Sequence, residues 1–193
     1  MDIGTSYGLA LSSGINAYLP LLSFAVAVRW LHLYTVQPPF EYVTSDWFMI
    51  VLAILALADL FADKIPGVDH VWDVIHTVLR PLAGALVAAV SQHQVSGAGL
   101  VVPVVLGAGL AGLAHVTKAS VRVTSTATSV GFLNPIISVL EDIGMLIGTA
   151  LSLLAPIVMV IVIVLFVLFF LLTVPRLLKR WRNRRMKRAV AGS

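Results

Sequence analysis

Long apolar stretches separated by short polar ones run through most of the chain. A bilayer core of about 30 Å is crossed by about 20 helical residues, and apolar segments of roughly this length can be drawn six times. The pattern therefore predicts an all-α polytopic membrane protein whose transmembrane domain covers residues 1–175. The approximate spans are residues 3–28, 47–62, 68–90, 99–116, 135–154 and 157–174.

The two last spans share one uncharged stretch between Ile143 and Pro175. A single helix of this length is too long for one upright crossing, so Pro156 is the expected break between two antiparallel spans. One long, heavily tilted helix would fit the same composition.

Two polar stretches interrupt the apolar pattern. In the first span, residues 12–20 combine small side chains with Asn16 and a proline, which predicts either a discontinuous helix or a kinked helix packed closely against its neighbours. Residues 117–134 are either a cytoplasmic loop or a re-entrant segment whose hydroxyls and cations meet an anion. The predicted helix-breaking residues are Gly14, Pro20, Pro135 and Pro156.

Short internal matches suggest a repeat. Residues 56–60 (ALADL) resemble residues 139–143 (VLEDI), and the tripeptide GLA occurs at both 8–10 and 109–111. Their order fits two inverted halves of three spans, as in many secondary transporters, although short apolar strings also match by chance. Six short spans offer few facing helices, so we expect a homodimer.

The composition supports the membrane class. Of the 193 residues, 59% are hydrophobic and 11% charged, whereas a soluble domain has about 45–50% and about 25%. The absence of cysteine excludes disulfides and thiolate nucleophiles. The first span has no basic segment before it, so we interpret it as a membrane span and not as a cleaved signal peptide.

The cations are concentrated at the C-terminus, in residues 176–193. Without this basic tail, residues 1–175 hold 5 cations against 9 acids. Cytoplasmic loops are rich in Lys and Arg, so both termini are expected in the cytoplasm, with the tail on anionic lipid head groups and not on nucleic acid. The tail cations are Arg176, Lys179, Arg180, Arg182, Arg184, Arg185, Lys187 and Arg188.

The third span carries the most distinctive polar pattern. Asp69, Asp73, His76 and Arg80 follow one another at i, i+4, i+7 and i+11, which places them on one helix face. Such a stripe either relays protons or binds a cation, or it is neutralised in a buried ion network with partners such as Asp142 or Lys118. No specific metal motif is present, and we expect no metal and no cofactor.

The leading hypothesis is a small secondary transporter or channel-like permease, coupled to protons or cations, for an anionic solute or lipid phosphate. The alternative is a non-transporting scaffold or lipid-organising protein with a structural ion-pair network. An enzyme is not expected, because no nucleophile–base motif or glycine-rich phosphate loop stands out. The candidate pathway residues are Asn16, Asp59, Asp63, Asp69, Asp73, His76, Arg80, Lys118, Arg122, Glu141 and Asp142.

Four strings carry a family resemblance: residues 13–20 (SGINAYLP), 63–69 (DKIPGVD), 72–73 (WD) and 80–84 (RPLAG). They resemble a bacterial membrane protein family described only as domain-of-unknown-function family 4126. The resemblance covers most of residues 5–155 and implies a small polytopic protein of the bacterial inner membrane. It implies no activity and no catalytic residues.

Overall fold

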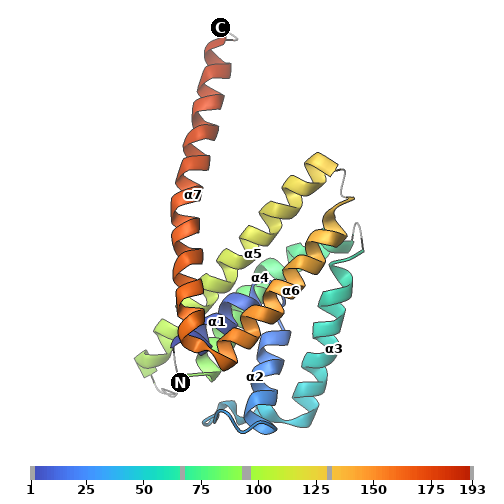
Figure 1. The fold of residues 1–193 in the computed structure, drawn as a ribbon, viewed down its shortest axis with the longest axis vertical. Coiled ribbons are helices and arrows are strands. Elements are labelled where there is room, and N and C mark those ends of the chain that lie inside the picture. The colour runs from blue at the N-terminus through green and yellow to red at the C-terminus, as the bar shows by residue number, and fades with distance from the viewer. Residues whose placement is uncertain (1–2, 66–67, 93–96, 130–131, 192–193) are drawn as a thin grey trace.

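The computed structural model describes residues 3–65, 68–92, 97–129 and 132–191 (Figure 1). Among these residues all regular structure is helical, which confirms the all-α class. Side chains at residues 69–70, 97–98, 174 and 177–191 lie outside the description. In chain order the elements are α1 (Ile3–Ser13), α2 (Leu19–Arg29), the 3-10 helix η1 (Phe40–Thr44), α3 (Asp46–Ala62), α4 (Val68–Val90), the 3-10 helix η2 (Gly97–Leu100), α5 (Val101–Ser129), α6 (Asn134–Leu154) and α7 (Pro156–Ala191).

Four helices are long and apolar enough to cross a membrane. They are α5, α6 and the segments Val71–Val90 of α4 and Pro156–Thr173 of α7. The helices α1 and α2 have 11 residues each and fall short of a full crossing by length alone, whereas α3, with 17 residues, is at the lower limit of about 17–25. A membrane protein is supported, and the count of six spans is not established.

The short helix α1 lies at the centre of the molecule, in contact with α4, α5, α6 and α7. Nine of its 11 residues are buried. Small residues allow α1 to lie between the other helices. A Cβ atom added to Gly8 would lie only 3.1 Å from the Cβ of Ser152 in α6. The absence of side chains there lets α6 approach the backbone of α1 closely.

The predicted helix-breaking prolines begin helices instead of interrupting them. Pro20 lies in the first turn of α2, Pro135 in the first turn of α6, and Pro156 is the first residue of α7. Proline suits these positions because the first amides of a helix have no partner within the helix. The chain between α1 and α2 is non-helical from Gly14 to Tyr18, ahead of the proline.

The interpretation of residues 117–134 as a loop or re-entrant segment was wrong for residues 117–129. Helix α5 continues through them to Ser129. Hydroxyl groups are accommodated because they bond to the carbonyl one turn earlier, as Thr117 does with Leu113 at 2.8 Å and Thr124 with Ser120 at 2.8 Å. Residues 130 and 131 lie outside the described part of the chain.

Helices α6 and α7 divide the long uncharged stretch in two. The helix α6 ends at Leu154, α7 begins at Pro156, and the chain reverses direction between them (Figure 1). The apolar span in α7, Pro156–Thr173, agrees with the predicted span of residues 157–174, and the helix itself continues through Pro175 to Ala191. Arg176 is exposed, whereas the side chains of the other tail cations lie outside the described residues.

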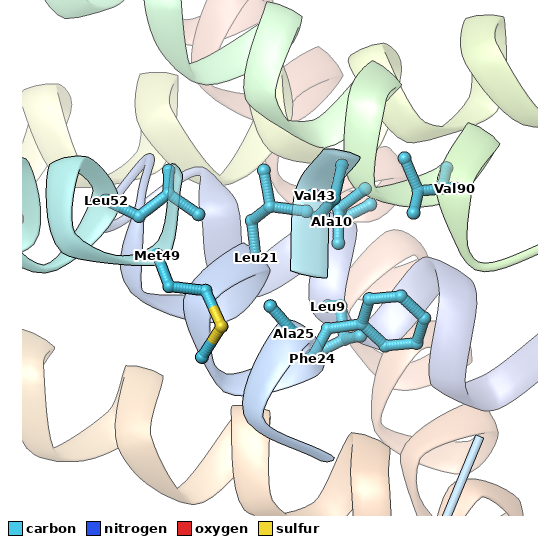
Figure 2. Close-up of a cluster of buried hydrophobic side chains, with 11 residues drawn as sticks. Leu9, Ala10, Leu21, Phe24, Ala25, Val43, Met49, Leu52 and Val90 are labelled. Atoms are coloured by element: carbon cyan, nitrogen blue, oxygen red, sulfur yellow. The ribbon is translucent and has the colours of Figure 1, made fainter. Parts of the chain in front are cut away.

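Two kinds of packing hold the bundle together. Figure 2 shows an apolar cluster in which α1, α2 and α3 meet η1 and the end of α4. Between α4 and α5 the backbones touch, because a Cβ on Gly84 would lie 2.6 Å from the carbonyl oxygen of Gly107. The labelled members of the apolar cluster are Leu9, Ala10, Leu21, Phe24, Ala25, Val43, Met49, Leu52 and Val90.

Candidate functional site: a buried charged network

Charged side chains from four helices meet in the interior. They come from the end of α3 and from α4, α5 and α6, and the most central are almost fully enclosed. Arg80 is 0% exposed and Asp59 is 1% exposed. Burying ions is costly unless they are paired, so their partners decide what the network can do.

Arg80 of α4 is the hub of one half of the network. Its Nη2 lies 3.3 Å from Oδ1 of Asp59 and 3.7 Å from Oδ2 of Asp63, and its Nη1 lies 3.3 Å from Oδ1 of Asp73. The same Nη1 is 2.9 Å from Nδ1 of His115. The two terminal nitrogens of one guanidinium, Nη1 and Nη2, therefore connect three carboxylates and an imidazole.

Asp63 is the hub of the other half. It pairs with Nζ of Lys118, and its Oδ2 lies 3.2 Å from Nη2 of Arg122. Arg122 then reaches Glu141 of α6 at 3.3 Å and Asp73 of α4 at 3.7 Å. These contacts tie α5 to α3, α4 and α6, and they explain how two cations are tolerated inside α5.

A separate pair lies beside the network. Nζ of Lys64, just after α3, lies 2.5 Å from Oδ2 of Asp142 in α6. The two side chains are 33% and 13% exposed, so this pair is the least buried part of the charged region. Asp142 is therefore neutralised locally and makes no ion pair with Arg80 or Lys118.

The link between α1 and α2 is built into the network. The Asn16 carboxamide oxygen accepts hydrogen bonds from the amides of Tyr18 and Leu19, and its Nδ2 donates to the carbonyl of Ala56. The amide of Ala17 donates to Oδ2 of Asp59 at 3.2 Å. In addition, Lys118 donates to the carbonyl of Ile15. Backbone groups released where the helix stops thus find partners among buried side chains.

A cavity of about 500 Å³ opens onto the network. It lies between α1, α5, α6 and α7, and most of its lining is apolar. Its polar side chains are Ser12 of α1, Thr117 and Lys118 of α5, and Glu141 of α6. A ligand in this cavity would meet one cation and one carboxylate of the network directly.

The structure brings most of the predicted residues together. Asp59, Asp63, Asp73, His76, Arg80, Lys118, Arg122 and Glu141 share one cluster, Asp142 lies in the adjacent pair, and Asn16 holds the helix link. The side chain of Asp69 lies outside the described residues. Within the described part of the chain, no group of three His, Asp or Glu side chains is placed to hold a metal ion.

Three network residues were missed by the sequence reasoning: Lys64, Trp72 and His115. The indole Nε1 of Trp72 donates to Oδ1 of Asp59 at 2.7 Å. His115 precedes Lys118 by three residues and Arg122 by seven, a spacing that puts all three on one helix face. This stripe would have been recognisable if residues 117–129 had been assigned to a helix.

The fold and the network define an all-α protein with apolar helices of membrane-spanning length around a buried charged cluster. The chain belongs to the family whose model is described as "Domain of unknown function (DUF4126)", which matches residues 3–176. This confirms the resemblance found from the sequence strings. No curated protein and no solved structure matches the chain.

Proposed function

We propose that the protein is a small secondary transporter or channel-like permease, coupled to protons or cations, that moves an anionic solute or a lipid phosphate. The observation that carries the proposal is the cavity of about 500 Å³ that reaches the charged network through Lys118 and Glu141. Ionisable residues are expensive within a membrane, and they commonly mark ion and substrate pathways there. No enzymatic activity is proposed.

The chemistry of the network fits an anionic substrate. Lys118 faces the cavity, and Arg80 and Arg122 lie behind it with several carboxylate contacts each. An anion that enters can compete with these carboxylates for the cations, while Asp73 and Asp142 bind or release protons. His76 relays protons between them, and Asn16 orients the helix link beside the site.

A specific observation favours a second candidate, a non-transporting scaffold or lipid-organising protein. The cations of the network each pair with at least one carboxylate within 4 Å, as a purely structural network would require. In this candidate the ion pairs fix the helix register, and the basic tail binds anionic lipid. The two candidates differ in whether water and solutes reach the cavity.

Thiol labelling separates the two candidates, because the chain has no cysteine of its own. Ser12→Cys and Thr117→Cys are small changes at cavity-lining positions, and Ile147→Cys on the exposed apolar face of α6 is the control. In vesicles, a transport pathway predicts that membrane-impermeant thiol reagents modify both cavity positions and leave the control unmodified. Unreactive cavity positions, with a reactive Arg176→Cys as reference, would favour the scaffold.

Flux measurements test the transport reaction itself. Vesicles of phosphatidylethanolamine and phosphatidylglycerol that contain the protein and a pH-sensitive dye are given a gradient of inorganic phosphate. Asp73→Asn is expected to abolish proton movement, whereas Asp46→Asn, on an exposed pair with Arg29, should not change it. Unchanged flux in a folded Asp73→Asn variant would refute the role of Asp73.

The finer features of the membrane arrangement are proposals as well. We propose that α1 and α2 form one discontinuous span and that α3 is a further span, which gives six spans in an inverted three-plus-three arrangement. We place both termini in the cytoplasm of a bacterial cell, with the protein in the inner membrane as a homodimer. The partners of the tail are anionic lipid head groups.

A further inference from the structure

His76 is a fully enclosed histidine with one ring nitrogen unused. Its Nδ1 lies 2.9 Å from the carbonyl oxygen of Trp72. A carbonyl oxygen can only accept, so Nδ1 carries a hydrogen. The Nε2 atom has no hydrogen-bond partner among the described residues, and it lies 3.7 Å from Oδ1 of Asp59. The neutral ring therefore directs a lone pair at the edge of a buried carboxylate.

The second histidine of the network has the opposite arrangement. Nδ1 of His115 lies 2.9 Å from Nη1 of Arg80, which can only donate, so this nitrogen must be the acceptor. Its Nε2 is 3.2 Å from the hydroxyl of Thr77. Both nitrogens of neutral His115 are used, and an added proton would point at a guanidinium. Of the two histidines, His76 is the one with a place for a proton.

The charges of the cluster give the reason for that proton. Four carboxylates, of Asp59, Asp63, Asp73 and Glu141, face three cations, of Arg80, Lys118 and Arg122. With both histidines neutral, the cluster carries one uncompensated negative charge. Five of its seven charged residues are buried, and the side chains of Asp73 and Glu141 are 15% exposed. One added positive charge would neutralise the cluster, and removal of the imbalance lowers the cost of burial.

The surroundings of His76 place the added charge beside Asp59. Asp59 and Asp63 approach from the end of α3, Arg80 from the same helix and His115 from α5. The Tyr18 ring of the link packs edge-on at 5.9 Å between centroids. Two carboxylates thus oppose one guanidinium and one neutral imidazole, and Oδ1 of Asp59 lies 3.7 Å from Nε2.

We propose that the His76–Asp59 pair is the binding site for the coupling proton, an inference that rests on the transporter function proposed above. A hydronium ion transfers the proton to Nε2 of His76, its O–H bond breaks to leave water, and the new N–H donates to Oδ1 of Asp59. The same Oδ1 accepts hydrogen bonds from Trp72 and Arg80. His76 lies on α4 like Trp72 and Arg80, so the bound proton adds a third α4 donor to Asp59 and strengthens the contact between α3 and α4. Loss of the proton weakens this contact.

Trp72 is a built-in reporter of this proton. Its ring lies 4.9 Å from the His76 ring, between centroids, at an interplanar angle of 33°. A charged imidazolium at this distance interacts with the indole face, and it changes the indole fluorescence. Replacement of the other three tryptophans, Trp30, Trp47 and Trp181, by phenylalanine leaves Trp72 as the single source of signal.

The experiment is a pH titration of Trp72 fluorescence in the full chain in lipid nanodiscs. We expect one transition with the shape of a single-proton titration between about pH 4 and 9. It should be absent in His76→Gln, retained in His115→Gln, and moved to lower pH in Glu141→Gln, which removes the negative charge that the proton would otherwise balance. A transition that persists in His76→Gln, that disappears only in Glu141→Gln, or that is absent from the parent protein would overturn the proposal.

A second measurement is read from the unmodified protein, with variants used only to assign the signals, and it covers the case in which His76→Gln does not fold. Histidine-selective 15N NMR of the unmodified protein reports whether Nε2 of a buried histidine gains a proton while Nδ1 keeps its own. Five histidine signals are expected, and assignment comes from the loss of one signal in His115→Gln and in the other single variants. If no buried histidine changes protonation, the site assignment is refuted.

The proton site and the transport function can fail separately. A His76 titration in a protein that moves neither protons nor phosphate across vesicles would keep the site and reject the transporter. Proton-coupled flux in a protein whose His76 never titrates would keep the transporter and reject the site. The pair of measurements therefore gives a separate answer to each question.

Discussion

Asp63 is the position at which the network can be tested most sharply, because a single carboxylate serves three cations. Its partners are Lys118, Arg122 at 3.2 Å and Arg80 at 3.7 Å, and the residue is only 3% exposed. Asp63→Asn keeps the volume and removes the charge. Asp63 is the carboxylate that pairs with the buried Lys118, so its removal leaves that ammonium without its partner, and breaking a buried pair in this way costs about 3–5 kcal/mol.

The measurement is the free energy of unfolding in mixed detergent micelles, followed by circular dichroism. Asp46→Asn is the matched control, because it makes the same chemical change in an ion pair whose aspartate side chain is 72% exposed. Exposed pairs contribute about 0–1 kcal/mol. We therefore expect Asp63→Asn to lower the free energy of unfolding several-fold more than Asp46→Asn does.

A double variant tests the reason for the loss and not only its size. Lys118→Met removes the cation that pairs with Asp63 and keeps much of the apolar length of the side chain. If the cost comes from an unpaired buried charge, the double variant should be more stable than the sum of the two single changes predicts. Strict additivity, or equal losses for Asp63→Asn and Asp46→Asn, would refute the description of a tightly coupled buried network.

Three further predictions use the same unfolding measurement. Gly107→Ala should destabilise the protein, because the added Cβ would meet the Gly84 backbone. Gly109→Ala is the control: its added Cβ would have nothing within 4 Å, so this change should be neutral or stabilising by up to about 1 kcal/mol. Equal effects of the two changes would contradict the close contact between α4 and α5. Phe24→Ala should cost about 3–5 kcal/mol, because the ring is 0% exposed in the apolar cluster, and a loss below about 1 kcal/mol would contradict that packing. Asn16→Ala should cost about 1–3 kcal/mol, because the amides of Tyr18 and Leu19 lose their acceptor, and no loss would show that these hydrogen bonds contribute nothing.

Much of the fold followed from apolar periodicity. Residues 68–90 were predicted as one helix and form α4 with those bounds, and α6 begins one residue before its predicted start. The prediction failed at residues 117–129, where polar side chains were interpreted as the sign of a loop or a re-entrant segment. Lys118 and Arg122 lie in the middle of a helix, since their charges are neutralised by partners on other helices, which local sequence does not reveal.

The sequence predicted most residues of the charged network but few of the ion pairs between them. The spacing of Asp73, His76 and Arg80 placed them on one helix face, and the structure directs this face at the end of α3 and at α5. Which cation serves which acid depends on the relative rotation and depth of neighbouring helices. Asp142, considered as a partner of the stripe, is instead neutralised by Lys64.

The position of Asp59 connects the helix link with the charged network. Its Oδ2 accepts from the amide of Ala17 in the link, while its Oδ1 accepts from Arg80 and Trp72 of α4. A proton shared between His76 and Oδ1 would change the second set of contacts and leave the first in place. In the proposed transporter, the bound proton would hold α4 on Asp59 and its loss would loosen that contact, while the link between α1 and α2 stays anchored to Asp59. The moving element would be the α4–α5 pair, whose backbones are in contact at Gly84 and Gly107, and its motion would bring Lys118 away from the carbonyl of Ile15 and open the cavity beside it.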